Sequence, residues 1–545
     1  MEIYDYIVVG AGSAGCAIAS RLSENPSLSV LLIEAGPRTD NFWVRTPAGM
    51  GMLFMNRRYN WAYSTQPVPT LGGRSVYWPR GKGLGGSSAI NGMIYMRGQA
   101  HDYDSWAQLG NPGWGWRDVL PYFIRSETNA RGASEFRGGN GPLSVSDPAE
   151  LHPTVRDFVE AARNSGVPRS EDLNAPPHPS VGFRQYTIKR GRRHTAYDAF
   201  IAPVRHRRNL SVLTDTQVLR VLLSSAAATG VEVLQGGQPR RIAAAREVIL
   251  SGGALASPQL LMLSGIGDPA RLHRHGIATQ LELPGVGCNL QDHWYASFAW
   301  RSTPQSSVNH RLRGVRKYLE GARYLMTRGG YLAMGAAPVI AYVCSEEQRQ
   351  HADVQLSFSP LTFAFSPSGE PQPDKFAAVA GSMVMLTPES RGHMDLSSAD
   401  PLQAPAFHPN YLSHPDDIRR SIAGMRQLRR IAQTRPLASR LLEEIKPGPA
   451  ATSDEQLLDY LKSAGGTAFH PVGTCKMGND PMAVVDARLR VRGIHRLRVM
   501  DASIMPTIVT GNTHAPCVMI GERGADMIRE DAVPPRVLAA SQEFK

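Results

Sequence analysis

The hydrophobic pattern at the start of the chain predicts a strand, a helix and a second strand. A β-branched run at 6–9 leads into a glycine-rich turn, an Ala-rich helical stretch follows at 16–22, and an apolar run at 29–33 ends at Glu34. In this order the three elements form a complete βαβ unit, the building block of nucleotide-binding α/β sheets.

Further apolar runs along the chain predict two groups of strands and two helices. The first group of strands is expected at 210–213, 218–223, 231–234 and 248–250, and strands of a second sheet are expected at 354–358 and 384–386. Apolar residues that recur every three or four positions predict amphipathic helices over 416–434 and 453–463. No internal repeat or low-complexity linker interrupts this pattern.

Residues 311–328 predict a basic amphipathic helix. Its apolar positions step by three and four, and they are Leu312, Val315, Leu319, Ala322 and Met326. Its cations lie off that stripe, at Arg311, Arg313, Arg316, Lys317 and Arg323. We favour a surface helix whose stripe packs on the domain to which these residues belong. A membrane-facing or lid helix beside a site entrance stays open as the alternative.

Composition narrows the class of protein and its compartment. The 545 residues are 42% hydrophobic and 19% charged, which allows a large core and excludes compositional disorder. A net charge of +12 favours solubility, and no nucleic-acid partner is expected because the charge is dispersed. Five widely spaced cysteines without a CxxC pair predict a reducing compartment and no metal site. With neither a signal peptide nor a spanning segment recognised, we expect a cytoplasmic protein, with peripheral inner-membrane contact through 311–328 as an open alternative.

The turn after the first strand matches a dinucleotide-binding fingerprint. Gly10 allows the tight turn, Gly12 lets the backbone approach a pyrophosphate, and Gly15 lets the helix pack on the strand. The helix N-terminus then offers free N–H groups to phosphates. Glu34 follows at the distance expected for an acid that binds a ribose diol. The pattern does not separate NAD from FAD, but its position at the N-terminus and the sequence Glu-Ala-Gly at 34–36 are typical of flavoproteins.

Several longer motifs carry a family resemblance. They are the glycine-rich loop at 80–92, the block at 253–267, the block at 283–293, the sequence His-Pro-Val-Gly-Thr at 470–474, and the stretches at 501–506 and 511–516. In order and spacing they resemble the glucose–methanol–choline (GMC) oxidoreductases, FAD enzymes that oxidise alcohols. Within that family the chain is most similar to the choline-dehydrogenase-like alcohol dehydrogenases.

The resemblance implies a mixed α/β (α+β) fold of two domains. A Rossmann-like FAD-binding domain is expected from 1–155, 190–300 and 466–545, so that it is discontinuous in sequence. A substrate-binding domain built on an antiparallel sheet is expected from 156–189 and 301–465.

The resemblance also implies the site residues. His470 corresponds to the histidine that acts as general base beside the flavin, and His514 is placed at the second catalytic position, where relatives carry His or Asn. Ser13 and Ala14 are expected at the phosphates, and Val218 at the adenine. Further cofactor contacts are expected at Gly10, Gly12, Gly15, Glu34, Ala35, Trp61, Gly83, Ser87, Asn91, Gly92, Met93, Ile94, Asp501, Asn512 and Thr513. No histidine occupies 89–91, where some relatives tether the flavin, so non-covalent FAD is expected.

The expected reaction is oxidation of a primary alcohol, with proton transfer to a histidine base and hydride transfer to flavin N5. A histidine at 514 weakens a simple transfer of choline as the substrate. An oxygen-using oxidase, a lyase or decarboxylase on the same scaffold, and a flavin protein without enzymatic activity stay open as alternatives. The electron acceptor also stays open among a quinone, a carrier protein and oxygen.

Overall fold

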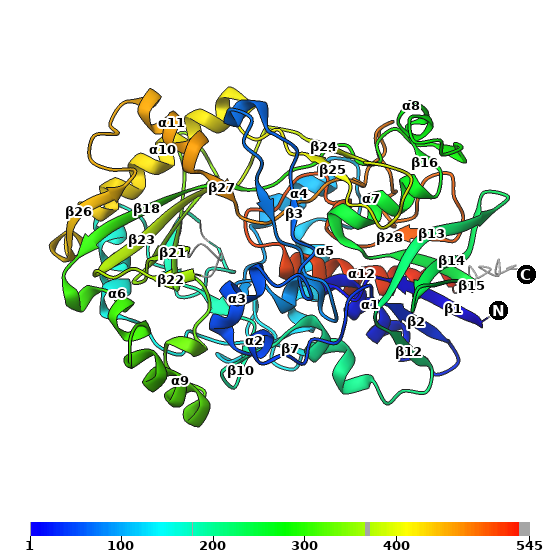
Figure 1. Cartoon of the computed structure of the whole chain (residues 1–545), viewed down its shortest axis with the longest axis horizontal. Helices are drawn as coiled ribbons and strands as arrows, with labels where there is room; N and C mark the ends of the chain where they lie inside the picture. Colours follow the sequence, from blue (N-terminus) through cyan, green and yellow to red (C-terminus); the bar gives the residue numbers. More distant parts are fainter. Residues whose placement is uncertain (1, 177, 366–370, 533–545) are drawn as a thin grey trace, which may run out of the picture.

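Two seven-stranded sheets organise the computed structural model, which describes residues 2–176, 178–365 and 371–532. The first sheet has the strand order β12-β2-β1-β15-β14-β13, and β28 pairs with β15. These strands are β1 (Glu2–Val9), β2 (Val30–Ile33), β12 (Leu210–Leu213), β13 (Thr216–Ser224), β14 (Ala227–Gln235), β15 (Gln238–Leu250) and β28 (Leu497–Val499). Segments from the two ends and the middle of the chain therefore share one sheet (Figure 1).

The parallel part of the first sheet is buried on both faces. The pairs β12–β2, β2–β1, β1–β15 and β15–β28 are parallel, and all four residues of β2 are buried. Continuous apolar runs are typical of such strands, which explains why the pattern predicted them. Strand β1 begins at Glu2, earlier than the apolar run at 6–9, because its first half is paired but exposed. Helices α1 (Ser13–Leu22) and α12 (His514–Ala532) pack against each other beside this sheet.

The second sheet is antiparallel, with the order β26-β18-β23-β20-β19-β8 and β27 paired to β18. Its strands are β8 (Ser180–Phe183), β18 (Trp294–Ser302), β19 (Val339–Val343), β20 (Val354–Ser359), β23 (Ala378–Met385), β26 (Leu441–Lys446) and β27 (Gly466–Thr467). Strand β18 begins before residue 301 and β27 lies after residue 465. The second sheet therefore takes strands from ranges that the sequence analysis assigned to the first domain.

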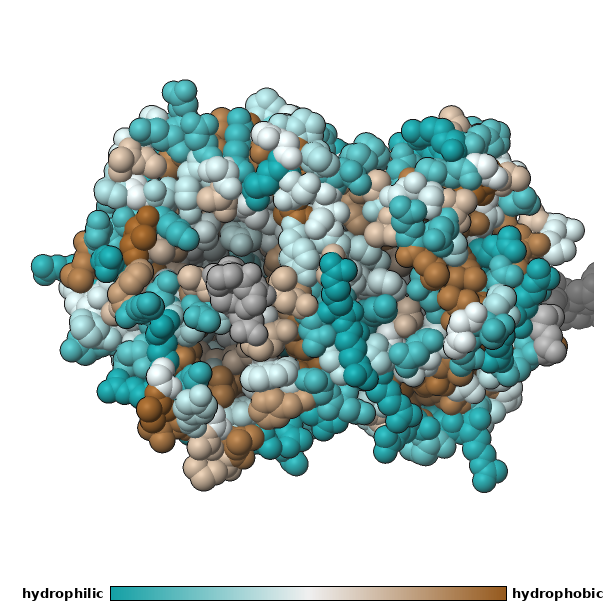
Figure 2. All heavy atoms as spheres, in the orientation of Figure 1, coloured by the Kyte–Doolittle hydropathy of each residue, from teal (hydrophilic) through white to brown (hydrophobic). Residues whose placement is uncertain are grey.

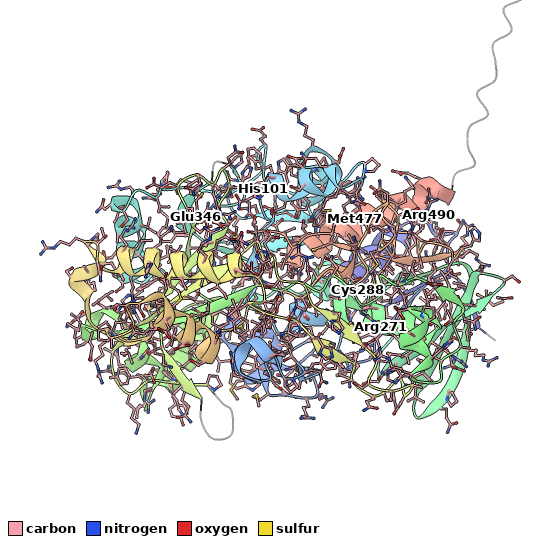
Figure 3. All side chains as sticks on the ribbon, turned by 90° about the horizontal axis from the view of Figure 1, so that it is seen from above. His101, Arg271, Cys288, Glu346, Met477 and Arg490 are labelled. Atoms are coloured by element: carbon pink, nitrogen blue, oxygen red, sulfur yellow. The ribbon has the colours of Figure 1, made fainter. Side chains whose placement is uncertain are left out.

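Helices cover one face of the second sheet. α6 (Pro153–Asn164) packs on β8 and β19, and α10 (Pro415–Ala432) packs on β20 and β23. Seen from above, α10 lies across this sheet, and α12 lies beside the first one (Figure 3). Strand alternation sends Leu356 and Phe358 into the helix-covered core, while Gln355 and Ser357 point to the opposite face. That opposite face is available to line a site.

The helix expected over 311–328 is shorter in the structure, and its apolar side chains face solvent instead of the core. A 3-10 turn, η7 (Asn309–Leu312), precedes α9 (Arg316–Thr327), and Gly314 between them has a left-handed φ of 56°. The expectation that the apolar stripe packs on its own domain is wrong, because Val315 is 76% exposed and Met326 is 79% exposed. Glu320 and Tyr324 are the buried residues of α9. No helix in the described ranges has the length and apolar character needed to cross a bilayer.

Candidate active site

The turn between β1 and α1 brings backbone into close contact. Gly10 has a φ of 101°, and a Cβ at Gly15 would lie 1.9 Å from the carbonyl oxygen of Gly10. Only glycine fits at Gly15 without moving this backbone. Helix α1 starts after Gly12 without a side-chain cap, so its first N–H groups are free to bind an anion.

Glu34, at the end of β2, joins three loops. Its carboxylate accepts hydrogen bonds from the backbone N–H groups of Ala11 (3.0 Å), Gly36 (2.9 Å) and Gly83 (2.9 Å). Burial raises the pKa of Glu34, and these backbone donors act against that rise. The residue expected to bind a ribose therefore also fastens the nucleotide turn to the glycine-rich loop.

The glycine-rich loop packs directly on the nucleotide turn. The N–H of Gly85 donates to the carbonyl of Ala11 at 2.8 Å, and a Cβ at Gly86 would lie 2.8 Å from the Cα of Gly12. Beyond the loop, the Asn91 side-chain oxygen accepts from the N–H of Met93 and from the guanidinium of Arg193, both at 2.9 Å. This arrangement holds the backbone after Asn91 in one conformation.

One cavity of about 1140 Å³ gathers most of the residues that the sequence analysis selected. Those that line it are Gly10, Gly12, Ser13, Ala14, Glu34, Ala35, Trp61, Ser87, Asn91, Gly92, Met93, Ile94, Val218, His470, Asp501, Asn512, Thr513 and His514. Gly15 and Gly83 do not line it: Gly15 packs under the turn, and Gly83 donates to Glu34. The volume and the uncapped helix suit a large ligand with phosphates.

The second sheet closes the other end of the same cavity. Gln355 and Ser357 of β20 line it, together with Ser382 and Val384 of β23 and Tyr295 of β18. These residues alternate with core residues along each strand. The register of a strand therefore fixes which residues enter the hydrophobic core and which line the cavity. The cavity therefore has one end at the nucleotide turn and the other against the antiparallel sheet.

His470 is held by two side chains that act on its two ring nitrogens. Its Nδ1 lies 2.9 Å from Nδ1 of His293, and its Nε2 lies 3.0 Å from the side-chain nitrogen of Asn512. The Nε2 of His293 lies 2.9 Å from the carbonyl oxygen of Leu386. A carbonyl oxygen only accepts, so Nε2 of His293 carries the proton and its Nδ1 accepts from His470. The Nε2 of His470 is then an unprotonated lone pair.

Burial keeps both rings of this pair neutral. Burial lowers the pKa of His293 to about 4. Burial is also the main cause that holds the pKa of His470 well below its ordinary value of 6.5, and nearby His293 acts in the same direction. At neutral pH the Nε2 of His470 consequently carries no proton, and its lone pair accepts the hydrogen bond from the side-chain nitrogen of Asn512.

Asp292 fixes the backbone on which His470 stands. Its carboxylate accepts from the N–H of His470 at 2.7 Å and from the hydroxyls of Tyr411 and Thr467. Asp292 and His293 belong to the block at 283–293, which the sequence analysis identified but to which it gave no role. The run of three polar residues at the end of that block, Gln291 to His293, was the available signal.

His514 takes a place different from the one expected for it. It lies at the N-terminal end of α12, and its Nδ1 is 2.8 Å from the hydroxyl of Ser13. Within the described ranges no hydrogen bond joins it to His470, and Asn512 stands at that ring instead. Burial lowers the pKa of His514 to about 4, and its Nε2 is buried without a partner in the structure. His514 lines the cavity together with Ser13 and Ala14 of the first turn of α1.

The charged groups around the cavity are unevenly distributed. Among the described lining residues the only acids are Glu34 and Asp501, while Arg57, Arg74, Arg80 and Arg184 also line it. Asp501 accepts hydrogen bonds from the N–H groups of Gly253 and Ser503, both at 2.8 Å. Both carboxylates are therefore committed to backbone donors, and neither belongs to the second sheet.

Comparison with known proteins identifies one family over most of the chain. The family model described as GMC oxidoreductase matches twice, an N-terminal model at residues 4–295 and a C-terminal model at 388–521. An alcohol dehydrogenase [acceptor] of Pseudomonas putida is 41% identical over 533 residues, which cover 96% of each chain. The mitochondrial choline dehydrogenase of Mus musculus is 39% identical over 535 residues, covering 96% of this chain and 89% of the relative.

Solved structures resemble the whole chain as well. The crystal structure of pyridoxine 4-oxidase from Mesorbium loti superposes with a TM-score of 0.87 at 32% identity, covering 97% of this chain and 99% of that one. A formate oxidase structure superposes with a TM-score of 0.90 at 28% identity and the same coverage. Both similarities extend over nearly the whole chain, which includes the two sheets and the residues that line the cavity.

Proposed function

Because this chain belongs to the GMC oxidoreductase family, we propose that it oxidises a primary alcohol to the aldehyde, with His470 as the general base. It is an FAD-dependent oxidoreductase that acts on CH–OH donors. The observation that carries the assignment of the base is the hydrogen-bond chain from Leu386 through His293 to His470. This series of hydrogen bonds leaves the Nε2 of His470 unprotonated, so it can accept the proton of the substrate hydroxyl.

The residues present suit FAD. The free N–H groups of α1 and the absence of a Cβ at Gly12 allow a pyrophosphate to approach. Glu34 follows the turn at the sequence separation expected for an acid that binds the ribose. The unpartnered Nε2 of His514 supports a role for this side chain toward the cofactor beside Ser13. When bound, FAD supplies the acceptor for the hydride that leaves the alcohol carbon.

The proposed role of this chain in the reaction is to hold the alcohol oxygen and remove its proton. The Nε2 of His470 accepts the hydroxyl proton, and Asn512 holds the oxygen next to that nitrogen. The side-chain nitrogen of Asn512 carries two N–H groups, so the one that does not face His470 can donate to the alcohol oxygen while the hydroxyl proton goes to His470. Asp292 and His293 hold the base in position and in its tautomer.

The charges of the cavity favour a neutral alcohol over choline. A quaternary ammonium is best held by aromatic faces and a nearby carboxylate. The two acids in the described lining follow strands β2 and β28 of the first sheet and hydrogen-bond to the backbone, and the arginines repel a cation. We therefore propose an aliphatic or aromatic primary alcohol as the substrate class.

Anaerobic mixing of the holoenzyme with alcohols tests the reaction. A neutral primary alcohol is expected to bleach the flavin absorbance, whereas choline at the same concentration leaves it oxidised. Turnover without bleaching would indicate a lyase and contradict the proposal, and bleaching by choline alone would contradict the substrate class. Readmission of oxygen then separates an oxidase, which recovers its colour rapidly, from a dehydrogenase.

Non-covalent attachment of FAD has its own test. The loop before Asn91 holds no histidine, and Arg193 occupies the side-chain oxygen of Asn91. Acid precipitation of the holoenzyme is expected to release yellow flavin into the supernatant. Flavin that stays with the pellet would contradict this expectation.

A further inference from the structure

Helix α9 exposes an apolar face to solvent. Val315, Tyr318, Leu319, Leu325 and Met326 are all more than half exposed, although they follow one another at helical spacing. In a globular protein such a face normally packs on the core, and a contiguous exposed one marks an interaction surface. The space-filling view shows hydrophobic atoms gathered at the tip where Figure 1 draws α9 (Figure 2).

Neighbouring elements extend this apolar face. The turn η8 (Tyr331–Ala333) contacts both α9 and the turn η1 (Pro47–Gly49), and η1 adjoins α2 (Phe42–Arg45) and α3 (Met50–Phe54). Further large apolar side chains are exposed on or next to those helices, at Phe42, Trp43, Met52 and Met55. We call α9 together with α2 and α3 the apolar edge. Its exposed aromatic and aliphatic side chains are of the kind found in helices that lie in a membrane interface.

Five of the six cations between 311 and 328 form no salt bridge with the residues that the structure describes. Among the described residues, no salt bridge is formed by Arg311, Arg313, Arg316, Lys317 or Arg328, whereas Arg323 pairs with Glu150 at 3.1 Å. Glu320 is the one acid between 311 and 328, and it is buried on the protein side of the helix. Unpaired cations that flank an exposed apolar stripe can keep their charges at the level of lipid phosphates while the stripe enters the acyl region.

We propose that the apolar edge docks on an anionic lipid bilayer, with α9 lying in the interface. Charge complementarity favours this occupant over a second copy of the chain, because two such edges face to face would bring like charges together. A bilayer also accommodates a convex, protruding helix, which offers no groove to a partner. The interaction is peripheral, since α9 has 12 residues and is too short to cross.

The apolar edge adjoins the cavity, because α3 contributes residues to its wall. Met50 and Phe54 of α3 line the cavity, and Ala336 and Ala337, which follow η8, line it as well. Docking through α9, α2 and α3 consequently turns this side of the cavity toward the membrane.

Vesicle co-sedimentation of the FAD-loaded full chain tests the docking. Vesicles of phosphatidylcholine with about one-third phosphatidylglycerol are expected to carry the protein into the pellet, and pure phosphatidylcholine vesicles are not. Raising the salt from about 0.05 M to about 0.5 M is expected to release most of the bound protein. Protein that stays in the supernatant with the anionic vesicles would overturn the proposal.

Two pairs of variants separate the apolar and the electrostatic contributions. Leu319→Glu with Met326→Glu is expected to abolish binding, whereas Leu109→Glu with Leu442→Glu, at other exposed apolar positions, leaves it intact. Arg316→Ser with Lys317→Ser is expected to weaken binding roughly thirtyfold. The matched pair Arg205→Ser with Arg208→Ser, exposed cations elsewhere, should have little effect.

Fold and self-association are measured on the same variants. Each variant is expected to keep its flavin absorbance and melting temperature, because the changed side chains point to solvent. If Leu319→Glu with Met326→Glu is unstable, Arg316→Ser with Lys317→Ser still decides the question. Binding unchanged in the folded variants would refute the role of α9. Analytical sedimentation that shows a dimer of the unmodified protein, and monomers of the α9 variants, would also refute the proposal. The apolar edge would then be covered by a second copy of the chain.

Discussion

His293 stands perpendicular to His470, with the ring planes at 90° and the centroids 5.1 Å apart. Their Nδ1 atoms lie 2.9 Å apart, and His293 continues to the carbonyl of Leu386, the residue after β23. The second sheet is thereby connected to the proposed base through one neutral imidazole. This relationship makes His293 a positioning residue whose hydrogen bond selects the tautomer of His470.

Replacement of His293 should separate a tautomer effect from loss of packing. His293→Leu removes the acceptor for Nδ1–H of His470 and is expected to lower kcat/KM by at least roughly tenfold, because the wrong tautomer leaves the proton on Nε2. His293→Asn, whose side-chain oxygen can accept the same proton, should retain more activity. The measurement is the pH profile of kcat/KM with the flavin content held constant. Equal activities of the two variants would argue against the positioning role.

His470→Ala should lose at least roughly a hundredfold in turnover while it retains FAD, as expected for a general base. The pKa of His470 lies below 6.5 in the structure, so the base stays unprotonated as pH falls through 6.5. We expect the acid limb of kcat/KM in the unmodified enzyme to lie below that pH. A fully active His470→Ala variant, assayed by flavin reduction in stopped flow, would exclude the residue as the base.

Asn512 and His514 should have different phenotypes although they are two positions apart. Asn512→Ala removes the donor at Nε2 of His470 and is expected to lower kcat/KM roughly tenfold to hundredfold with FAD retained. His514→Ala removes the partner of Ser13 and is expected to weaken FAD retention more than the chemical step. Flavin content after gel filtration and single-turnover reduction rates distinguish the two. The opposite pattern would return the second catalytic position to His514.

Glu34 should contribute to both cofactor retention and stability. In Glu34→Gln an amide nitrogen faces at least one of the backbone N–H groups that donate to the carboxylate in the unmodified protein. The lost hydrogen bond is expected to lower the free energy of unfolding by about 1–3 kcal/mol. We expect weaker FAD retention and a lower melting temperature of the flavin-free protein. Glu282→Gln, an exposed position, is the control. A change in FAD retention with an unchanged flavin-free melting temperature would show that Glu34 acts on the ribose alone.

His194 should make stability depend on pH. The N–H of Ser144 donates to its Nδ1 at 3.1 Å, and burial lowers the pKa of His194 from 6.5 to about 4. Below pH 6.5 the unfolded chain binds a proton that the folded protein binds only near pH 4. The contribution of His194 to the free energy of unfolding is therefore complete above pH 6.5. It falls by about 1.4 kcal/mol for each pH unit as the pH drops from 6.5 to about 4.

The variant His194→Asn keeps an acceptor for Ser144 and removes the proton-binding site. Its melting temperature is expected to decline less steeply between about pH 6.5 and about pH 4 than that of the unmodified protein. His206→Asn, at an exposed histidine, serves as the control. Parallel curves for the unmodified protein and His194→Asn would show that protonation of His194 does not contribute.

Local sequence predicted those elements whose pattern repeats over a few residues. The βαβ unit, the strand Leu210–Leu213 and helix α10 follow from apolar periodicity, because burial acts on each of them through its own spacing. The direction of α9 was not predictable in this way. Its stripe has the same periodicity whether it faces the core or the solvent, and the burial of Glu320 and Tyr324 decides between them.

Local sequence was sufficient for the nucleotide turn, the order of the motifs and the presence of a histidine at 470, since these depend on neighbouring residues and on their types. The folded chain was needed to show that Asn512 stands at that histidine, that His514 turns to Ser13, and that His293 approaches from 177 positions away. Hydrogen bonds across such separations could not be predicted, because they are set by how the two sheets meet. No local periodicity records that meeting.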